Sequence, residues 1–414
     1  MTASARLIQC PYRLKNPVRH YEWGERGPSA FIARLLKVTS LEKRPYAELW
    51  VGAHPSDPSF LEFPDGSKMP LPEAITRWPL EIMGSRVTQD FGGSWPFLFK
   101  ILSAAEPLSI QAHPDATQAR LLHLQDPLHY PDPNPKPEIA VALSRFKALL
   151  GFKPVEGWYE VFRVFSEVAT FLEADSLHSD RGSGFLKKAF SRLLKKAQKN
   201  KDALAFTVTA TAKRIREAPE PFGTMADLFQ ELMAKYGPAD VGLLVLLFLN
   251  PVELLPGQAI FLAPGLPHAY LAGNIVECMT NSDNVIRLGL TPKHKDFNAM
   301  LQVLHFEPYK PLIMTPSQGS HTAYKVPCEA FEIHRWILKA RTKIPMQRPE
   351  GPEILFIIQG RGEIVWNANN ATGSIPYHKG QSFLIPAFLP DYTVIPHTQT
   401  LAFTAQVPST ASRP

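Results

Sequence analysis

The residues best suited to chemistry lie in the run Ser109-Ile110-Gln111-Ala112-His113-Pro114. Apolar and polar residues alternate there, which predicts a strand with one apolar and one polar face. Gln111 and His113 would then project from the same face, about 7 Å apart, near enough to bind one ion. A segment with five prolines, residues 127–138, follows and ends in Glu138. Because each proline fixes φ, this loop is stiff and suited to presenting a carboxylate to a metal.

A further ligand is expected from a distant histidine. The chain has thirteen histidines, and an isolated one is more often structural than a metal ligand. His268 differs because it ends a strand-like segment that begins at Gly257 and lies beside other donors. With Gln111, His113 and Glu138 it would form a set without a thiolate, which leaves a divalent cation Lewis-acidic. Such a set suits zinc, with manganese, iron or nickel possible on ligand type.

Two more polar residues follow His268. Segments 274–279 and 284–288 are strand-like and are joined by the turn-forming residues 281–283, which predicts a hairpin. A hairpin would place Glu277 and Arg287 on neighbouring strands. From the residues alone, the simpler interpretation of this pair is a cross-strand salt bridge, and the alternative is an active-site pair.

Composition bounds the class of protein. The 414 residues include 44 basic and 38 acidic ones, which are interspersed, so the net charge of +6 does not indicate nucleic-acid binding. The basic run at 187–201 alternates with apolar residues at helical spacing and predicts the solvated face of an amphipathic helix. No apolar stretch is long enough for a signal peptide or a membrane span. Three scattered cysteines favour a reducing compartment, so we expect a cytoplasmic protein.

The elements that must position these residues fall into three parts. Residues 1–153 are mostly strand-like, as at 31–35, 48–51 and 97–101, with one short helix over 71–83. Residues 154–250 have helical spacing at 158–174, 185–198, 204–218 and 225–236, and a buried helix is expected at 241–249. Strand-like sequence returns at 256–262. We therefore predict a mainly β protein with a catalytic β domain (1–153 plus 251–327), a helical insertion (154–250) and a C-terminal β domain (328–414).

A weak internal repeat links the two β parts. Gly257-Gln258 opens a segment that reaches His268, and Gly380-Gln381 opens one that reaches Asp391 with equal offsets. A glycine-led strand with histidine eleven residues later resembles the second metal motif of the cupin family of jelly rolls. The resemblance implies two related jelly rolls, of which only the first keeps the histidine.

Longer segments resemble a specific enzyme family. YEWG (21–24), AELWVGAHPS (47–56), PFLFKILSAAEPLSIQAHP (96–114), KPEIAVAL (136–143), GFKP (151–154), LPHAYLAG (266–273) and VECMTNSDNVIRLGLTPKHKD (276–296) are similar to the type I phosphomannose isomerases. The resemblance implies a monomeric zinc enzyme, with one zinc ion per chain, that interconverts mannose 6-phosphate and fructose 6-phosphate in mannose activation or catabolism. No nucleic-acid or membrane partner is implied.

The same resemblance assigns the site. It places the zinc ligands at Gln111, His113, Glu138 and His268, and the catalytic arginine at Arg287. It also places in the pocket the positions Trp23, Glu48, Lys100, Ser109, Lys136, Glu277 and Lys293. Of these, Glu277 and Lys136 are the candidates for the base that moves the carbon proton. This changes the interpretation of Glu277 and Arg287 from a salt bridge to active-site residues.

One position departs from the family pattern. Many members have a histidine before the lysine of the glutamate-ligand motif, where this chain has Pro135. Ring opening then uses another group, such as a metal-bound water, or that histidine is not essential. Two alternatives stay open: another cupin-type sugar-phosphate isomerase, and a sugar-phosphate-binding protein built on an inactive isomerase. Neither is favoured, because the ligands are widely spaced in sequence and none is lost.

Overall fold

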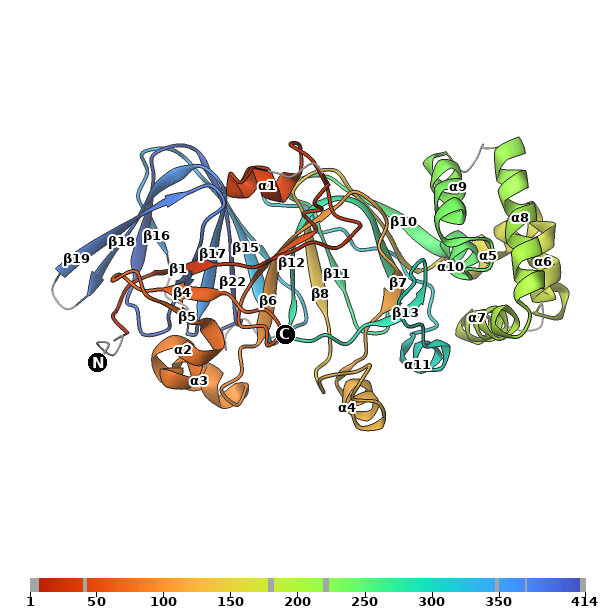
Figure 1. The fold of residues 1–414 in the computed structure, drawn as a ribbon, viewed down its shortest axis with the longest axis horizontal. Coiled ribbons are helices and arrows are strands. Elements are labelled where there is room, and N and C mark those ends of the chain that lie inside the picture. Colours follow the sequence, from red (N-terminus) through yellow and green to blue (C-terminus); the bar gives the residue numbers. More distant parts are fainter. Residues whose placement is uncertain are drawn as a thin grey trace.

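The computed structural model describes residues 7–39, 43–177, 182–218, 223–346, 350–368 and 371–409. Three groups of elements follow one another along its long axis: the C-terminal strands, a central group of strands, and the helices of residues 155–248 (Figure 1). This is the mainly β fold with a helical insertion that the sequence predicts. Within those ranges, none of the helices has both the length and the apolar character that a membrane span requires.

The central group is a ten-stranded sheet arranged around one long strand, β12. Its members are β2 (Val18–Arg19), β3 (Glu48–Val51), β6 (Phe97–Ala104), β7 (Ile110–Ala112), β8 (Glu138–Ala142), β9 (Phe146–Phe152), β10 (Leu249–Leu254), β11 (Ala259–Leu262), β12 (His268–Thr280) and β13 (Ile286–Gly289).

β12 changes partners along its length, which curls the sheet around the site. Its first residues pair with β9 and β7, and its last residues pair with β6 and β8. The change occurs at Gly273, where φ is +112° and a Cβ would lie 2.4 Å from the carbonyl oxygen of Arg145. Only glycine fits that conformation and that close approach. The bend places His268 and Glu277 on one strand, on either side of it.

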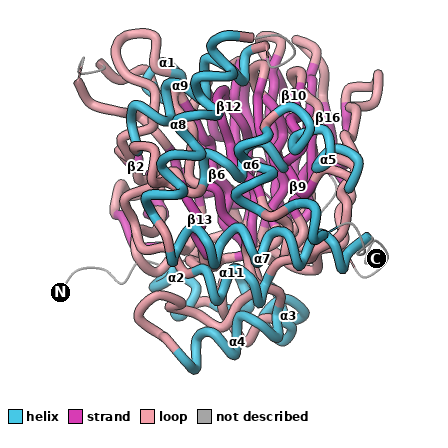
Figure 2. Tube along the Cα trace, turned by 90° about the vertical axis from the view of Figure 1, so that its right-hand side faces the viewer, coloured by secondary structure: helices cyan, strands magenta, loops and turns pink. Residues whose placement is uncertain are grey.

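The helices form an insertion between the paired strands β9 and β10. They are α5 (Val155–Val164), α6 (Ser166–Leu172), η1 (Ala174–Leu177), α7 (Gly182–Lys199), α8 (Lys201–Glu217), α9 (Thr224–Tyr236), α10 (Gly242–Val245) and η2 (Leu246–Phe248). When the molecule is viewed from the side of the insertion, α5 to α9 lie in front of the strands (Figure 2). Trp158 is fully buried and stacks on Phe248 with ring centroids 3.9 Å apart, which joins the first helix of the insertion to its last turn.

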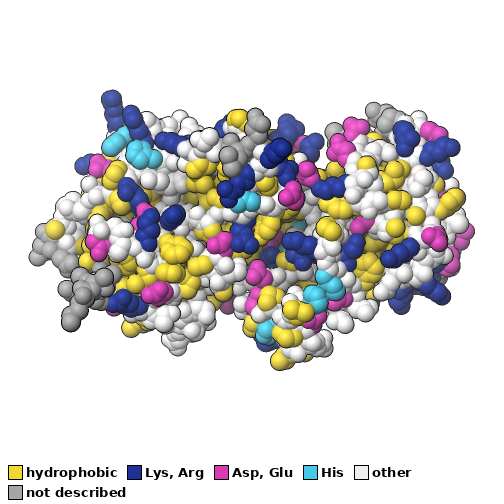
Figure 3. All heavy atoms as spheres, in the orientation of Figure 1, with side chains coloured by type: hydrophobic (Ala, Val, Ile, Leu, Met, Phe, Trp, Pro, Cys, Tyr) yellow, Lys and Arg dark blue, Asp and Glu magenta, His cyan; other side chains and the backbone are white. Residues whose placement is uncertain are grey.

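The helical spacing predicted these helices with two differences. The expected helix over 158–174 is broken at Phe165, and the expected helix at 241–249 is a short α-turn and a 3₁₀-turn that end before Leu249, the first residue of β10. In α7 the apolar side chains, such as Phe190 and Leu193, are buried while Lys187 and Lys195 are exposed. The basic run is therefore a solvated helix face. On the face shown in Figure 3, Lys and Arg side chains are interspersed with Asp and Glu.

The C-terminal strands form two further sheets that enclose a core of their own. The strands are β14 (His321–Tyr324), β15 (Glu332–Leu338), β16 (Ile344–Met346), β17 (Glu353–Gln359), β18 (Arg361–Ala368), β19 (Ala371–His378), β20 (Ser382–Ile385), β21 (Tyr392–Pro396) and β22 (Thr400–Gln406). Strands from the beginning of the chain extend the larger sheet: β1 (Tyr12–Lys15), β4 (Phe60–Glu62) and β5 (Lys68–Pro70).

The internal repeat is visible in the hydrogen bonds of two turns. Gly257 and Gly380 both have positive φ, +87° and +84°. The side-chain oxygen of Gln258 accepts from the amide three residues before it, at 2.8 Å, and that of Gln381 does the same, also at 2.8 Å. Each turn leads into a strand that starts two residues after its glycine. The two β parts thus share one local design, and Asp391 occupies the place of His268.

Two local predictions in the first third were wrong in detail. Residues 31–35, expected to be a strand, form helix α1 (Phe31–Leu36), and the single helix expected at 71–83 is a pair, α2 (Leu71–Arg77) and α3 (Pro79–Asp90). A five-residue apolar segment does not distinguish the two periods, and Trp78 with Pro79 interrupts the helical run. Two other helices, α4 (Ala116–Gln125) and α11 (Phe297–Val303), were not predicted.

The hairpin predicted between 274–279 and 284–288 does not form. β13 pairs with β7, whereas residues 275–279 of β12 lie between β6 and β8. Both edges of that part of β12 are already hydrogen-bonded, so it has no edge left for β13. Glu277 therefore faces Lys100 across the sheet, and Arg287 lies opposite Gln111.

Candidate active site

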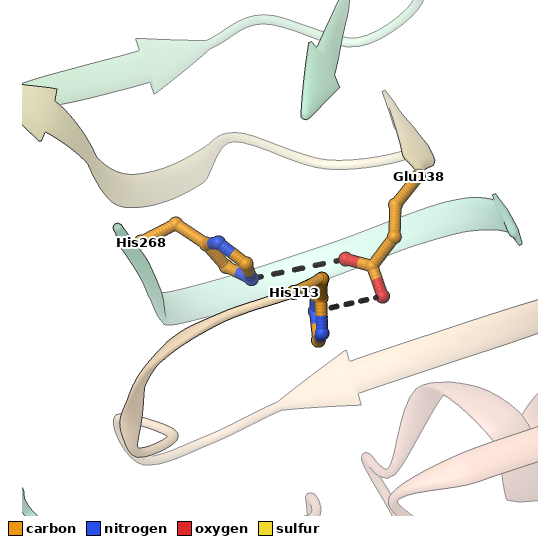
Figure 4. A group of neighbouring side chains, drawn as sticks. All are labelled: His113, Glu138 and His268. Atoms are coloured by element: carbon orange, nitrogen blue, oxygen red, sulfur yellow. Dashed lines mark ion pairs between the residues drawn. The ribbon is translucent and has the colours of Figure 1, made fainter. Parts of the chain in front are cut away.

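Three buried side chains converge where β7, β8 and β12 meet. His113 follows β7, Glu138 begins β8 and His268 begins β12, and each residue is at most 2% exposed. His113 Nε2 lies 3.3 Å from Glu138 Oε1, and His268 Nε2 lies 3.8 Å from Glu138 Oε2 (Figure 4). One ligand atom from each lies within 4.8 Å of the others. We call these three residues the histidine–carboxylate centre.

Backbone carbonyls fix both imidazole rings in one tautomer. His113 Nδ1 lies 2.9 Å from the oxygen of Asn284, and His268 Nδ1 lies 2.9 Å from the oxygen of Leu266. Because a carbonyl only accepts, each Nδ1 carries the proton and donates it. Both Nε2 lone pairs are therefore free to face Glu138. This arrangement of a ligand nitrogen backed by a carbonyl is typical of metal-binding histidines.

The centre fits a divalent cation. His113 Nε2 and Glu138 Oε2 are buried yet have no hydrogen-bond partner, although buried polar atoms normally have one. The Gln111 amide nitrogen lies 3.3 Å from His268 Nε2. The opposite orientation of that amide would direct its oxygen to the same place, since the two ends of an amide are interchangeable in shape. Two imidazoles, a carboxylate and an amide oxygen suit zinc.

The electrostatics of the centre favour deprotonated ligands. Burial lowers the pKa of His113, and burial with the nearby His113 lowers the pKa of His268 to about 4. Burial acts to raise the pKa of Glu138, but His113 and Lys136 outweigh it and hold that pKa well below its ordinary value. Neutral imidazoles beside an ionised carboxylate are the protonation states that a metal requires.

A second buried group, Lys100 with two carboxylates, lies on the neighbouring strands. Lys100 Nζ is 3.0 Å from Glu277 Oε2 and 3.7 Å from Glu48 Oε2. Burial acts to lower the pKa of Lys100, but the two carboxylates outweigh it and raise that pKa. Burial raises the pKa of Glu277, although Lys100 opposes this. Trp50 Nε1 donates to Glu48 at 2.5 Å, which holds the second carboxylate in place.

One pocket of about 950 Å³ connects these groups to solvent. Most of the residues predicted for the site line it: Trp23, Glu48, Lys100, Ser109, Gln111, Lys136, Glu138, Glu277, Arg287 and Lys293. The two histidines are in the adjoining centre. The structure therefore brings together every residue that the sequence assigned to the site, from segments far apart in the chain.

The basic side of the pocket has room for an anion. Burial lowers the pKa of both Arg287 and Lys293, and the charge of Arg287 lowers the pKa of Lys293 further. Lys293 Nζ lies 5.3 Å from the ring centre of Tyr21. Lys136 Nζ lies 3.3 Å from Glu138 Oε1, which places a further cation beside the histidine–carboxylate centre. A pocket with cations around a carboxylate centre suits a phosphorylated, hydroxyl-rich ligand.

Sequence reasoning missed an acid and its partner at the pocket wall. Asp283 lines the pocket, and its Oδ1 lies 3.3 Å from Nε2 of His54, which is 3% exposed. Ser56 N–H donates to His54 Nδ1, so the proton is on Nε2 and faces the carboxylate. Hydrogen bonding from His54 lowers the pKa of Asp283. Asp283 was taken only as a turn residue, and its spacing gave no other signal.

The position that departs from the family pattern lies outside this pocket. Pro135 lines a separate pocket of about 590 Å³ with Asn134 and Pro137, whereas Lys136 and Glu138 line the main one. In an extended segment alternate residues point to opposite sides, which explains why Pro135 and Pro137 are separated from Lys136 and Glu138. A side chain at position 135 therefore belongs to the far side of the loop.

Comparison with known proteins agrees with this geometry. Residues 12–155 match the family model for the phosphomannose isomerase type I catalytic domain. The mannose-6-phosphate isomerase of Ogataea parapolymorpha is 36% identical over 385 residues, covering 85% of this chain and 88% of that protein. The human mannose-6-phosphate isomerase is 34% identical over 404 residues, covering 91% and 93%.

Solved structures give the same result. A mutant of phosphomannose isomerase from Salmonella typhimurium superposes with a TM-score of 0.80 at 29% identity, over 96% of this chain and all of that one. A mannose 6-phosphate isomerase bound with zinc and yttrium superposes with a TM-score of 0.77 at 31% identity, over 95% and 98%. Because the similarity spans nearly the whole chain, from the strands to the helical insertion, this protein belongs to the type I phosphomannose isomerase family.

Proposed function

We propose that this protein is a zinc-dependent isomerase that interconverts mannose 6-phosphate and fructose 6-phosphate. The observation that carries the proposal is the histidine–carboxylate centre beside a pocket that contains both buried carboxylates and cations. His113, His268, Glu138 and Gln111 would hold the zinc ion. When bound, it would supply a Lewis acid that polarises oxygen atoms of the substrate. The names of the relatives supply the substrate.

The chain's own residues account for the proton movements. Isomerisation moves a proton between C1 and C2 through an enediol, which needs a base near carbon and a cation near oxygen. Glu277, held by Lys100 at 3.0 Å, and Lys136 are the two candidates for the base. Arg287 would stabilise the negative charge that develops on the enediolate oxygens. Lys100, Ser109 and Lys293 would contact the phosphate or the sugar hydroxyls, and Trp23 and Glu48 would complete the walls.

Ring opening precedes this step and does not require position 135. Opening a pyranose takes a proton from the O1 hydroxyl and gives one to the ring oxygen. Pro135 has no ionisable group and lines the other pocket. The polar groups of the main pocket would therefore perform the transfer.

The wider setting is also a proposal. We propose a monomer, as the resemblance to the type I phosphomannose isomerases implies. We propose the cytoplasm as its location, because Cys10, Cys278 and Cys328 are free, as expected in a reducing compartment. We propose a catalytic, a helical and a C-terminal domain, with β1, β4 and β5 completing the larger sheet of the C-terminal domain.

An assay with and without metal tests the function. Purified protein should convert mannose 6-phosphate to fructose 6-phosphate in an assay coupled to NADPH formation. Prolonged chelation followed by removal of the chelator should abolish turnover, and added zinc should restore it. Turnover that persists in metal-free protein would contradict the zinc proposal, and a protein that binds the sugar phosphate without converting it would favour the binding-protein alternative.

Replacing one ligand tests the site directly. His268→Ala removes a nitrogen from the centre, so zinc affinity should fall by at least about 10²-fold. Competition with a chromophoric chelator measures this without any activity assay. His123→Ala, on helix α4, is the matched control and should leave the affinity unchanged. Equal zinc affinity in both variants would remove His268 from the ligand set.

Replacing the arginine tests charge stabilisation. Arg287→Ala should lower kcat by roughly 10²-fold or more while zinc content stays the same, because the cation acts mainly on charge that develops in the transition state. Arg120→Ala, which removes an exposed arginine of α4, is the control. Near-normal kcat in Arg287→Ala would rule out this role.

Exchange with solvent deuterium separates the two candidate bases. Glu277→Gln keeps an oxygen that accepts from Lys100 but cannot take a proton, and Lys136→Gln is the matched variant. The variant that lacks the base should lose exchange of the C2 proton of mannose 6-phosphate, measured by NMR in deuterium oxide, by about 10²-fold or more. Wild-type exchange in Glu277→Gln, with zinc still bound, would leave Lys136 as the base.

A further inference from the structure

Asp240 lies where the helical insertion meets the end of β13. It is only 6% exposed and precedes α10 by two residues. Its neighbours across the contact are Gly289, the last residue of β13, and Leu290, which follows. This acid is thus supplied by the insertion but borders the segment that carries Arg287 and Lys293.

Both carboxylate oxygens of Asp240 are used. Oδ1 accepts from the backbone N–H of Gly242 at 2.8 Å and from that of Leu290 at 3.0 Å. Oδ2 accepts from Lys295 Nζ at 3.0 Å. One bond stabilises the turn of the insertion, and the other two hold residues on either side of Lys293. Although Asp240 borders the pocket, its acceptor atoms are directed to these donors.

The backbone at Leu290 needs this support. Its φ is +57°, a conformation that costs a non-glycine residue on the order of 1 kcal/mol or more and persists only where the surroundings impose it. Leu290 is 1% exposed, so removing Asp240 would take the acceptor away from a buried N–H. The base of the segment is closed by Asp296 N–H, which donates to the Arg287 oxygen at 3.3 Å.

Two glycines make the contact close. A Cβ at Gly289 would lie 2.5 Å from Asp240 Oδ1 and 2.7 Å from the Gly242 backbone. A Cβ at Gly242 would lie 2.9 Å from Leu290 Cγ. Either side chain would separate the insertion from the strand. The fit is therefore specific to this pair of segments.

We propose that Asp240 is a positioning residue through which the helical insertion sets the placement of Arg287 and Lys293. The inference rests on the proposed function for the roles of those two residues. The helical insertion would then contribute to catalysis, although the insertion supplies none of the proposed catalytic residues or metal ligands. Loss of the bonds should misplace both cations, and displacements of about 1 Å in a site can cost roughly 10²-fold.

Two substitutions separate the contributions of Asp240. Asp240→Ala removes all three bonds, and kcat/KM for mannose 6-phosphate should fall by about 10- to 100-fold with KM raised. Asp240→Asn keeps an oxygen for the two backbone donors and loses only the charge that pairs with Lys295, so it should stay within a few-fold of wild type. Gly289→Ala, which displaces the acid, should resemble Asp240→Ala.

A measurement without substrate decides the same question. Amide hydrogen exchange of residues 286–296 should be faster in Asp240→Ala than in Asp240→Asn. Val208→Ala, a buried position of α8, is the control for general loss of stability and should change neither this exchange nor KM. Zinc content should be equal in all four variants.

The outcomes distinguish this inference from the proposed function. Wild-type exchange in Asp240→Ala, or kinetics within twofold of wild type, would overturn the role of Asp240. A fall in kcat/KM that Val208→Ala reproduces at equal loss of thermal stability would overturn it as well. Inactive wild-type protein combined with faster exchange in Asp240→Ala would overturn the proposed function alone.

Discussion

The backbone hydrogen bonds of β12 hold the active site together. His268 lies opposite Gln111 on β7, Glu277 lies opposite Lys100 on β6, and Met279 lies opposite Glu138 on β8. Each pairing joins one part of the site to the next, so the register of a single strand fixes their separations. A slip of one residue would turn the side chains to the other face of the sheet. The bend at Gly273 then brings the two halves of the strand around one pocket.

The site contains several ionised side chains at buried positions, where the loss of hydration destabilises them. Glu138, Glu277 and Lys100 are all nearly inaccessible to solvent, and burying an ion is tolerated only when it is paired and hydrogen-bonded. Lys100 meets this requirement, because it is paired with Glu277 and Glu48. The histidine–carboxylate centre keeps two polar atoms without partners, which is the part of the site that a cation would complete. The burial of large apolar clusters stabilises the fold and offsets the cost of removing these ions from water.

Sequence patterns predicted which residues form the site better than they predicted which strands pair with one another. The alternation around Gln111 and His113, the stiff loop before Glu138 and the family motifs identified residues that the structure brings together. The pairing of strands was harder, because the turn at 281–283 resembles a hairpin turn although both edges of β12 are already occupied. The pattern in the sequence reports which face of a strand is apolar, but it does not report which strand is its neighbour.

The same limit explains two contacts that the sequence did not predict. His54 and Asp283 are more than two hundred positions apart, and Asp240 contacts Leu290 from another part of the fold. Neither contact has a periodicity or a motif of its own. Both depend on tertiary packing that a single sequence does not encode in local form. The side of the loop that Pro135 occupies is likewise a tertiary feature, because this residue lines the smaller pocket and not the main one.

The pairing of β1 with β20 has a consequence for how the protein is made. Tyr12 lies opposite Leu384, so β1 is completed by a strand that is synthesised much later. Contacts between such distant parts of a chain form slowly, since a long loop must close before any pairing is gained. Until then the edge of β1 is open to other chains. The yield of folded enzyme should therefore depend on chaperones and on the rate of synthesis more than on the final stability of the site.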